Sequence, residues 1–198
     1  MGILHRQPTP TVQVTDPDAL LVAWAQQSPR AFTALYDRYF DAVYGYCLGQ
    51  LGDAQAAEDA ASQTFLKALA ALAGYRETGR FRSWLFAIAH NVVLDVLRTR
   101  ASHAPLETAS DIHDPAESPE ERAIAALDAA WLDAAIARLP ASDRQVLELR
   151  RAGLRGAEIA AVLGISHEAA KKRQSRAIDL IRSEASVERT KPEVRRGA

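Results

Sequence analysis

The chain has 198 residues, of which 48% are hydrophobic, and its formal net charge at pH 7 is −1. This composition excludes disorder throughout the chain, and the length allows one or two compact domains. The single cysteine, Cys47, excludes an internal disulfide and a zinc site made of this chain's cysteines. Because no apolar run is long enough for a signal peptide or a membrane-spanning helix, we expect a cytoplasmic protein without a membrane partner.

The amino-terminal part begins with a leader and two helices. Residues 1–15 lack periodicity and are expected to be flexible. The first helix is predicted to start with Asp16 as its cap and Pro17 at its first position, and to end near Ser28. A second, longer amphipathic helix is expected to run from there to Gly52.

Two further helices complete this part. A third helix is predicted from about residue 53 to residue 72, with an apolar face of Phe65, Leu66, Leu69 and Leu72. A loop, "GYRETGR", leads to a fourth helix from residue 81 to about residue 98, whose expected core residues are Trp84, Leu85, Ile88, Val92 and Leu97. Asn91, Asp95 and Arg98 share one polar face of this helix because of their spacing.

The segment 101–122 differs sharply in composition from its neighbours. Between residues 101 and 121 it contains acidic residues and prolines but no lysine or arginine. It has too few large apolar residues to bury a core of its own. We therefore predict an acidic, flexible linker.

The carboxyl-terminal part resumes the helical pattern. One helix is predicted from near Ile124 to Leu139, and a second starts with Ser142 as its cap and ends near Gly153. The stretch "AEIAAVLGIS" then predicts the tight turn of a helix-turn-helix, in which Gly164 takes a positive φ and Ser166 caps the next helix.

The helix after this turn carries a dense basic cluster. Its members are Lys171, Lys172, Arg173 and Arg176. Basic side chains on a helix presented by a sharp turn are suited to phosphate neutralisation and to contacts in the major groove. This pattern favours DNA binding over a solvated face of an ordinary helical bundle.

The predicted fold is all-α, with two small helical domains joined by the acidic linker. No alternation typical of a β-sheet is present. The expected boundaries are a leader at 1–15, a first domain at 16–100, a linker at 101–122, a second domain at 123–183 and a flexible tail at 184–198.

The order of these motifs resembles the extracytoplasmic-function (ECF, group 4) sigma factors of bacterial RNA polymerase. The resemblance covers about residues 18–183. The stretches that carry it are "ALYDRYFDAVYGY", "AEDAASQTFLKAL", "GRFRSWLFAIAHNVVLDVLR", "ARLPASDRQVLELRRAGLRGAEIAAVLGIS" and "KKRQSRA". It implies a sigma region 2 followed by a sigma region 4, and an initiation factor with no catalytic activity of its own.

The resemblance implies that the first domain serves two purposes. It docks on the clamp helices of the largest polymerase subunit, here through Glu58, Asp59, Gln63 and Phe65. It also captures unpaired bases of the minus-ten element, for which aromatic and polar side chains are suited. The residues expected there are Tyr75, Arg76, Arg80, Arg82, Trp84, Asn91, Asp95 and Arg98. For Trp84, plain core packing is an equally good interpretation.

The resemblance gives the second domain the minus-thirty-five element as its target. The expected DNA contacts are Ser166, His167, Lys171, Lys172, Arg173 and Arg176. The implied partners are core RNA polymerase, including the flap of its second-largest subunit, promoter DNA and an anti-sigma protein. The acidic linker is expected to follow the path towards the RNA exit.

Two stretches depart from the family pattern. The docking helix reads "AAED" and Ser62-Gln63, so two customary acids are absent. One hypothesis is that phosphorylation of Ser62 or Thr64 restores negative charge there; the simpler alternative is that Glu58, Asp59 and apolar contacts suffice. The basic helix carries unusual residues at Ala169, Ala170, Lys172 and Gln174, which leaves its preferred bases open.

Other functions explain less of the chain. A helix-turn-helix regulator that acts without polymerase explains the second domain but not the first. An enzyme is disfavoured, because the five histidines lack ligand spacing and no glycine-rich phosphate loop is present. We therefore expect neither a cofactor nor a metal.

Overall fold

The structure is a computed structural model that describes residues 18–76, 80–103 and 119–190. Its regular elements are all helices, which confirms the predicted all-α class for this part of the chain. The predicted leader, the Asp16-Pro17 helix start, linker residues 104–118 and tail residues 191–198 lie outside it. None of the helices described is long and hydrophobic enough to cross a membrane.

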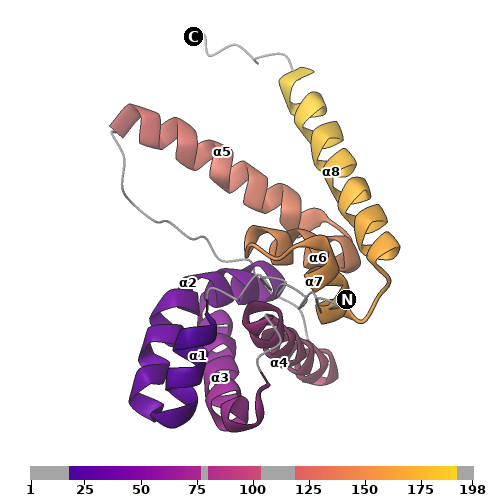
Figure 1. Cartoon of the computed structure of the whole chain (residues 1–198). Helices are drawn as coiled ribbons and strands as arrows, with labels where there is room; N and C mark the ends of the chain where they lie inside the picture. Colours follow the sequence, from indigo (N-terminus) through magenta and orange to yellow (C-terminus); the bar gives the residue numbers. More distant parts are fainter. Residues whose placement is uncertain (1–17, 77–79, 104–118, 191–198) are drawn as a thin grey trace, which may run out of the picture.

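The first unit is a helical bundle in the lower half of Figure 1. Its helices, in chain order, are α1 (Ala19–Gln27), α2 (Phe32–Leu51), α3 (Ala54–Ala71) and α4 (Phe81–His103). Two short 3-10 turns accompany them: η1 (Pro29–Ala31) lies between α1 and α2, and η2 (Leu72–Gly74) follows α3. α2 packs against α1, α3 and α4, so it forms the centre of this bundle.

The turn between α2 and α3 follows from three residues. Gly52 ends α2 with a φ of 65°, a conformation that glycine adopts without the steric cost of a Cβ atom. Asp53 then caps α3, because its carboxylate accepts a hydrogen bond of 2.7 Å from the backbone N–H of Ala56. The predicted end at Gly52 is confirmed.

The apolar face of α3 was predicted only in part. Phe65 and Leu72 are buried, with exposed fractions of 4% and 2%. Leu66 is 68% exposed and Leu69 is 38% exposed, so the predicted apolar face is not buried at these two residues. Small residues, including Ala61 and Ala68, form most of the buried face instead, which lets α3 approach its neighbours closely.

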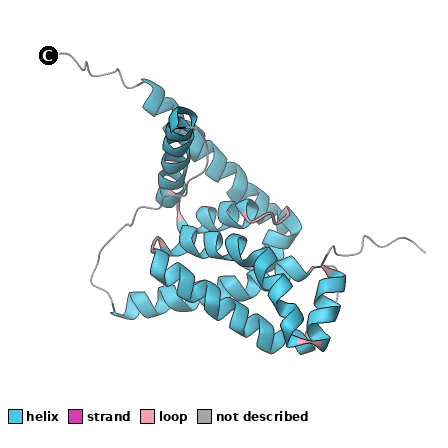
Figure 2. Ribbon diagram, turned by 90° about the vertical axis from the view of Figure 1, so that its left-hand side faces the viewer, coloured by secondary structure: helices cyan, strands magenta, loops and turns pink. Residues whose placement is uncertain are grey.

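The second unit contains four helices. They are α5 (Pro119–Arg138), α6 (Ala141–Arg151), α7 (Gly156–Leu163) and α8 (His167–Thr190). α5 and α8 are long and extend above the rest of the molecule, as Figure 1 and the turned view of Figure 2 show. A small apolar cluster of Ile136, Leu139 and Ala177 packs near their base.

Several predicted boundaries differ from those observed. α4 continues to His103 and α5 begins at Pro119, so both helices extend into the segment predicted as linker. α8 continues to Thr190, beyond the predicted end at Ser183. Ser142 does not cap α6, because the helix already begins at Ala141 and has no side-chain cap.

The two units pack against each other. α6 lies on α2 and α7 lies on α4, and one hydrophobic core continues from the first unit into the second. The contact between α2 and α6 is close at Gly49, where a Cβ atom would lie 2.4 Å from Cδ of Glu148. Glycine therefore makes room for a buried glutamate that the other unit supplies.

Candidate nucleic-acid interface

The turn between α7 and α8 has the predicted helix-turn-helix geometry. Gly164 ends α7 with a φ of 63°, and the N–H of Ile165 donates to the carbonyl of Ala160 at 3.0 Å. Ser166 caps α8, because its hydroxyl oxygen accepts a hydrogen bond of 3.1 Å from the N–H of Ala169. The roles predicted for Gly164 and Ser166 in this turn are confirmed.

The first turns of α8 are open to solvent. Ser166, His167, Lys171 and Lys172 are exposed, and Arg173 is half-buried. The ring of His167 lies against the start of α7, where a Cβ atom on Gly156 would come within 2.8 Å of its Nε2 atom. These side chains are thus presented together at one end of the helix-turn-helix.

Arg176 has a protein partner. Its Nε and Nη2 atoms donate to the two carboxylate oxygens of Asp143 at 2.6 and 2.5 Å. Asp143 lies in the first turn of α6 and is fully buried. The bond from Arg176 lowers the pKa of the Asp143 carboxyl below its usual range. The sequence predicted a DNA contact for Arg176, whereas the structure shows its guanidinium held by α6.

Four of the eight residues predicted to bind the minus-ten element line a cavity of about 390 Å³ between the two units. Tyr75, Arg76, Arg80 and Trp84 line it from the first unit, and α7 contributes Ala161 and Val162. The rings of Tyr75 and Trp84 lie 4.8 Å apart. Trp84 is half-buried against Phe81 while it lines the cavity, so it takes part in packing and also presents a surface.

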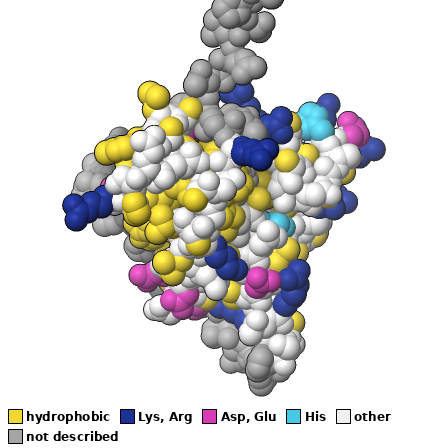
Figure 3. Space-filling model, turned by 60° about the horizontal axis from the view of Figure 1, so that its bottom comes forward, with side chains coloured by type: hydrophobic (Ala, Val, Ile, Leu, Met, Phe, Trp, Pro, Cys, Tyr) yellow, Lys and Arg dark blue, Asp and Glu magenta, His cyan; other side chains and the backbone are white. Residues whose placement is uncertain are grey.

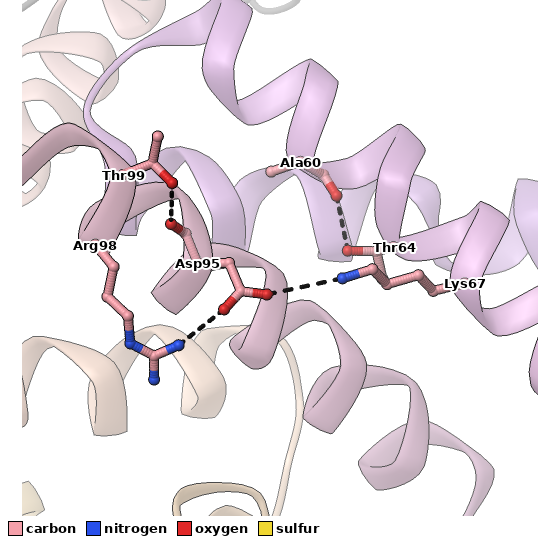
Figure 4. Close-up of polar contacts among 6 residues, drawn as sticks. All are labelled: Ala60, Thr64, Lys67, Asp95, Arg98 and Thr99. Atoms are coloured by element: carbon pink, nitrogen blue, oxygen red, sulfur yellow. Dashed lines mark hydrogen bonds and ion pairs between the residues drawn. The ribbon is translucent and has the colours of Figure 1, made fainter. Parts of the chain in front are cut away.

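Asn91, Asp95 and Arg98 continue this surface along α4. Spacing of three or four residues places them in one row with Trp84 and Ala87, which line the cavity, and all three are exposed. Figure 4 shows that Asp95 accepts a hydrogen bond from Arg98 at 2.8 Å and lies 3.8 Å from Nζ of Lys67 on α3. The shared polar face that the spacing predicted is confirmed.

Arg82 points towards the second unit. Its Nη1 atom donates to the carbonyl oxygen of Gly153, in the loop between α6 and α7, at 3.2 Å. The guanidinium carbon also lies 5.5 Å from the ring centre of Tyr39. In this arrangement Arg82 joins the two units, whereas the sequence predicted a contact with DNA.

The candidate docking surface is on α3. Glu58, Asp59 and Gln63 are exposed, but Phe65 is buried and packs against aromatic rings of α2. Leu66 is an exposed apolar residue of this face; the sequence analysis placed it on the apolar face of the helix but did not assign it to docking. Its spacing from Asp59 and Gln63 is the signal that places it there.

The view from below in Figure 3 shows hydrophobic side chains gathered on the left, while the histidines and most basic side chains lie on the right.

The two hydroxyls of the phosphorylation hypothesis differ in exposure. Ser62 is exposed. Thr64 is fully buried, and its hydroxyl donates to the carbonyl of Ala60 at 2.7 Å, as Figure 4 shows. A kinase cannot reach Thr64 in this fold, so only Ser62 remains as a candidate.

The comparisons with known proteins match both units. The model of Sigma-70 region 2 matches residues 35–103, and that of Sigma-70, region 4 matches residues 129–181. The ECF RNA polymerase sigma factor ShbA of Streptomyces griseus is 37% identical over 150 residues, which are 70% of this chain and 78% of ShbA. This chain belongs to the ECF sigma factors of RNA polymerase. It is a DNA-binding factor that directs transcription initiation.

Two other relatives support the same family. The ECF sigma factor BldN of Streptomyces coelicolor is 36% identical over 152 residues, which are 75% of this chain but 58% of BldN. The ECF sigma factor SigL of Mycobacterium tuberculosis is 33% identical over 153 residues, 75% of this chain and 85% of SigL. The first unit is therefore region 2 and the second is region 4.

Solved structures share the fold. CnrH in complex with the cytosolic domain of CnrY has a TM-score of 0.66 and 26% identity, and the match covers 86% of this chain and 97% of CnrH. The sigma factor RpoE of Bartonella quintana, in complex with the anti-sigma factor NepR, also has a TM-score of 0.66, over 79% of this chain and 97% of RpoE. Its identity of 20% supports the fold alone.

Proposed function

We propose that α8 of this sigma factor reads the minus-thirty-five element of its promoters as duplex DNA. The observation that carries the proposal is the exposed amino-terminal end of α8, which the tight turn at Gly164 presents. A helix held in this way can enter the major groove with its first turns towards the bases. The side chains we assign to this contact are Ser166, His167, Lys171, Lys172 and Arg173.

Region 2 takes the melted minus-ten element in this proposal. Aromatic rings near basic side chains suit single-stranded DNA, because bases stack on the rings while phosphates contact the cations. The cavity at Tyr75 and Trp84, with Arg76 and Arg80, has this composition. The row of Asn91, Asp95 and Arg98 extends it along α4. Because α7 borders the cavity, we infer that region 4 moves away from α4 before this surface binds DNA.

The α3 face is the proposed docking site for core polymerase. Glu58, Asp59 and Gln63 suit the basic clamp helices of the largest subunit, and Leu66 adds an apolar contact among them. We extend region 2 over residues 16–100 and region 4 over residues 123–183, with residues 101–122 as the connection that passes through the polymerase. The flap of the second-largest subunit is the proposed partner of region 4.

An anti-sigma protein is the proposed regulator of this factor. RpoE of Bartonella quintana forms a complex with the anti-sigma factor NepR, and CnrH forms one with the cytosolic domain of CnrY; both folds match this chain. We place the action of the protein in the cytoplasm, where RNA polymerase and promoter DNA are found.

The test is run-off transcription with purified core RNA polymerase, on DNA from upstream of the protein's own gene, together with co-elution of the two proteins. We expect a discrete transcript that requires the protein. The double variant Lys171→Ala/Lys172→Ala is expected to lose the transcript but to keep co-elution. Arg182→Ala is the matched control, because Arg182 lies farther along α8 and pairs with Asp179 at 3.7 Å.

Two results would contradict the proposal. One is tight binding of the free protein to duplex DNA without co-elution, which indicates a regulator that acts without polymerase. The other is equal transcription by the double variant and by wild type, which removes α8 from promoter recognition.

A further inference from the structure

Arg176 joins the recognition helix α8 to α6, a helix outside the helix-turn-helix pair. Two hydrogen bonds connect its guanidinium to the Asp143 carboxylate, Nε to Oδ2 at 2.6 Å and Nη2 to Oδ1 at 2.5 Å. This is the side-by-side geometry that arginine and a carboxylate form best. Because both oxygens are engaged, the pair fixes direction as well as distance.

Because Asp143 is buried, its carboxylate depends on the contact with Arg176. Its side chain is fully buried, whereas the Arg176 side chain is 59% exposed. Ser142 donates a further, longer hydrogen bond of 3.3 Å to Asp143, so Arg176 is its principal partner. A buried carboxylate without its cation is strongly unfavourable. The fold therefore holds Arg176 at this point of α8.

The apolar contacts nearby do not fix the orientation of α8 as closely. Ala177 of α8 meets Ile136 and Leu139 at the end of α5 in a small cluster, and Ala170 of α8 packs in the main core. Apolar packing is non-directional, so these contacts define the rotation of α8 about its axis less sharply than paired hydrogen bonds do. The directional pair beside the cluster adds this constraint.

Lys172 and Arg173 lie about one turn before Arg176 on the same helix. A rotation of α8 about its axis would therefore turn these cations relative to the groove. We propose that Arg176 is a positioning residue: with Asp143 it sets the orientation in which α8 presents its basic first turns, and it makes no phosphate contact of its own. This inference rests on the proposed role of α8 at the minus-thirty-five element.

The decisive variant is Asp143→Asn in the full chain, assembled with core polymerase. If Arg176 contacts DNA directly, this variant frees its guanidinium and removes a negative charge, so promoter affinity stays equal or rises. If Arg176 acts through Asp143, affinity falls by about tenfold. The probe is a promoter duplex that the wild-type holoenzyme selects from a random DNA pool.

Salt dependence separates the two roles a second time. The logarithm of the binding constant falls as the logarithm of the salt concentration rises, and each phosphate contact that is lost makes this slope less steep by about 0.9. We expect this change for Lys172→Ala, the matched control for a phosphate contact. Arg176→Ala and Asp143→Asn are expected to weaken binding while the slope stays at its wild-type value. Arg176→Lys is expected to recover little, because lysine keeps the charge but not the paired geometry.

Thermal melting and circular dichroism of each variant establish that region 4 is folded before binding is compared. Unchanged or tighter DNA binding by folded Asp143→Asn overturns the inference. A less steep salt dependence of binding for Arg176→Ala overturns it as well. If Lys172→Ala also changes neither affinity nor slope, α8 does not bind DNA in the proposed way, and the proposed function falls together with the inference.

Discussion

In region 2 half of the candidate DNA-binding side chains line a cavity that α7 borders, whereas in region 4 they lie on the first turns of α8. Both surfaces combine cations with a helix, but the first is partly covered by the other region, while Ser166, His167, Lys171 and Lys172 are exposed. Arg82 shows the difference at one residue, because it donates to Gly153 of region 4. Accessibility to DNA is therefore set by the packing of the two regions as well as by residue type.

The largest expected effect tests whether the two regions unfold together. Leu149 of α6 is fully buried in the core that continues into region 2. We expect Leu149→Ala to lower the free energy of unfolding by about 2–5 kcal/mol. Hydrogen exchange at increasing urea should report the loss in α4 as well as in α6.

The control for this variant is Leu180→Ala, since Leu180 is 40% exposed on α8. Its effect should stay within about 0.5 kcal/mol. Loss of protection in α6 with unchanged protection in α4 would show that the regions are energetically independent.

The contact between α2 and α6 can be broken more selectively at Gly49. A Cβ atom there meets the buried carboxyl of Glu148, so we expect Gly49→Ala to weaken the inter-region packing by about 1–3 kcal/mol. Gly45→Ala lies one turn away with open space around its Cβ, so it reports the gain in helix propensity alone. Small-angle scattering should show a larger radius of gyration for the first variant and no change for the second.

The packing of the two regions should also depend on pH through Glu148. Burial raises the pKa of this carboxyl, and Arg151 opposes the rise only in part. The packed form therefore favours protonated Glu148. The stability that this protonation contributes to the packed form is complete below the ordinary pKa near 4.5, and it is lost as the pH rises through the raised pKa. Between these two pKa values, the free energy of unfolding should fall by up to about 1.4 kcal/mol per pH unit.

Glu148→Gln removes this titration. We expect urea unfolding of the variant to depend less on pH than that of wild type, and its stability at neutral pH to be higher. An equal pH dependence in the two proteins would assign the effect to another group.

The smallest effect is expected at the cap of α8. Ser166→Ala removes the acceptor for the N–H of Ala169 and should cost about 1 kcal/mol of region 4 stability. Ser175→Ala, at an exposed position within the same helix, is the matched control. Chemical denaturation measures both, and equal stability of the two variants would show that the cap is dispensable.

The sequence predicted what depends on local pattern. Gly52, Gly164 and Ser166 have the roles expected of them, because a positive φ or a cap is decided within a few residues. The exposed row on α4 also follows from spacing alone. Family resemblance then supplied the two regions that the comparisons confirm.

What the sequence did not predict depends on distant neighbours. Arg176 and Lys172 belong to the same basic cluster, and only the position of α6 shows that one of them is engaged by Asp143. Leu66 matched an apolar pattern on α3 but faces solvent, because alanines fill the buried side. The packing of α7 on α4 joins segments that the linker separates, so no local signal reports it.

The shared core also affects how strongly this factor competes for its partners. A partner that needs the α4 surface free binds only the fraction of molecules in which region 4 has moved away. Its apparent dissociation constant equals the intrinsic one divided by that fraction. Each tenfold decrease in the open fraction therefore raises tenfold the concentration needed to half-saturate the α4 surface with that partner. Substitutions between α2 and α6 can thus set the threshold for transcription without touching DNA or polymerase.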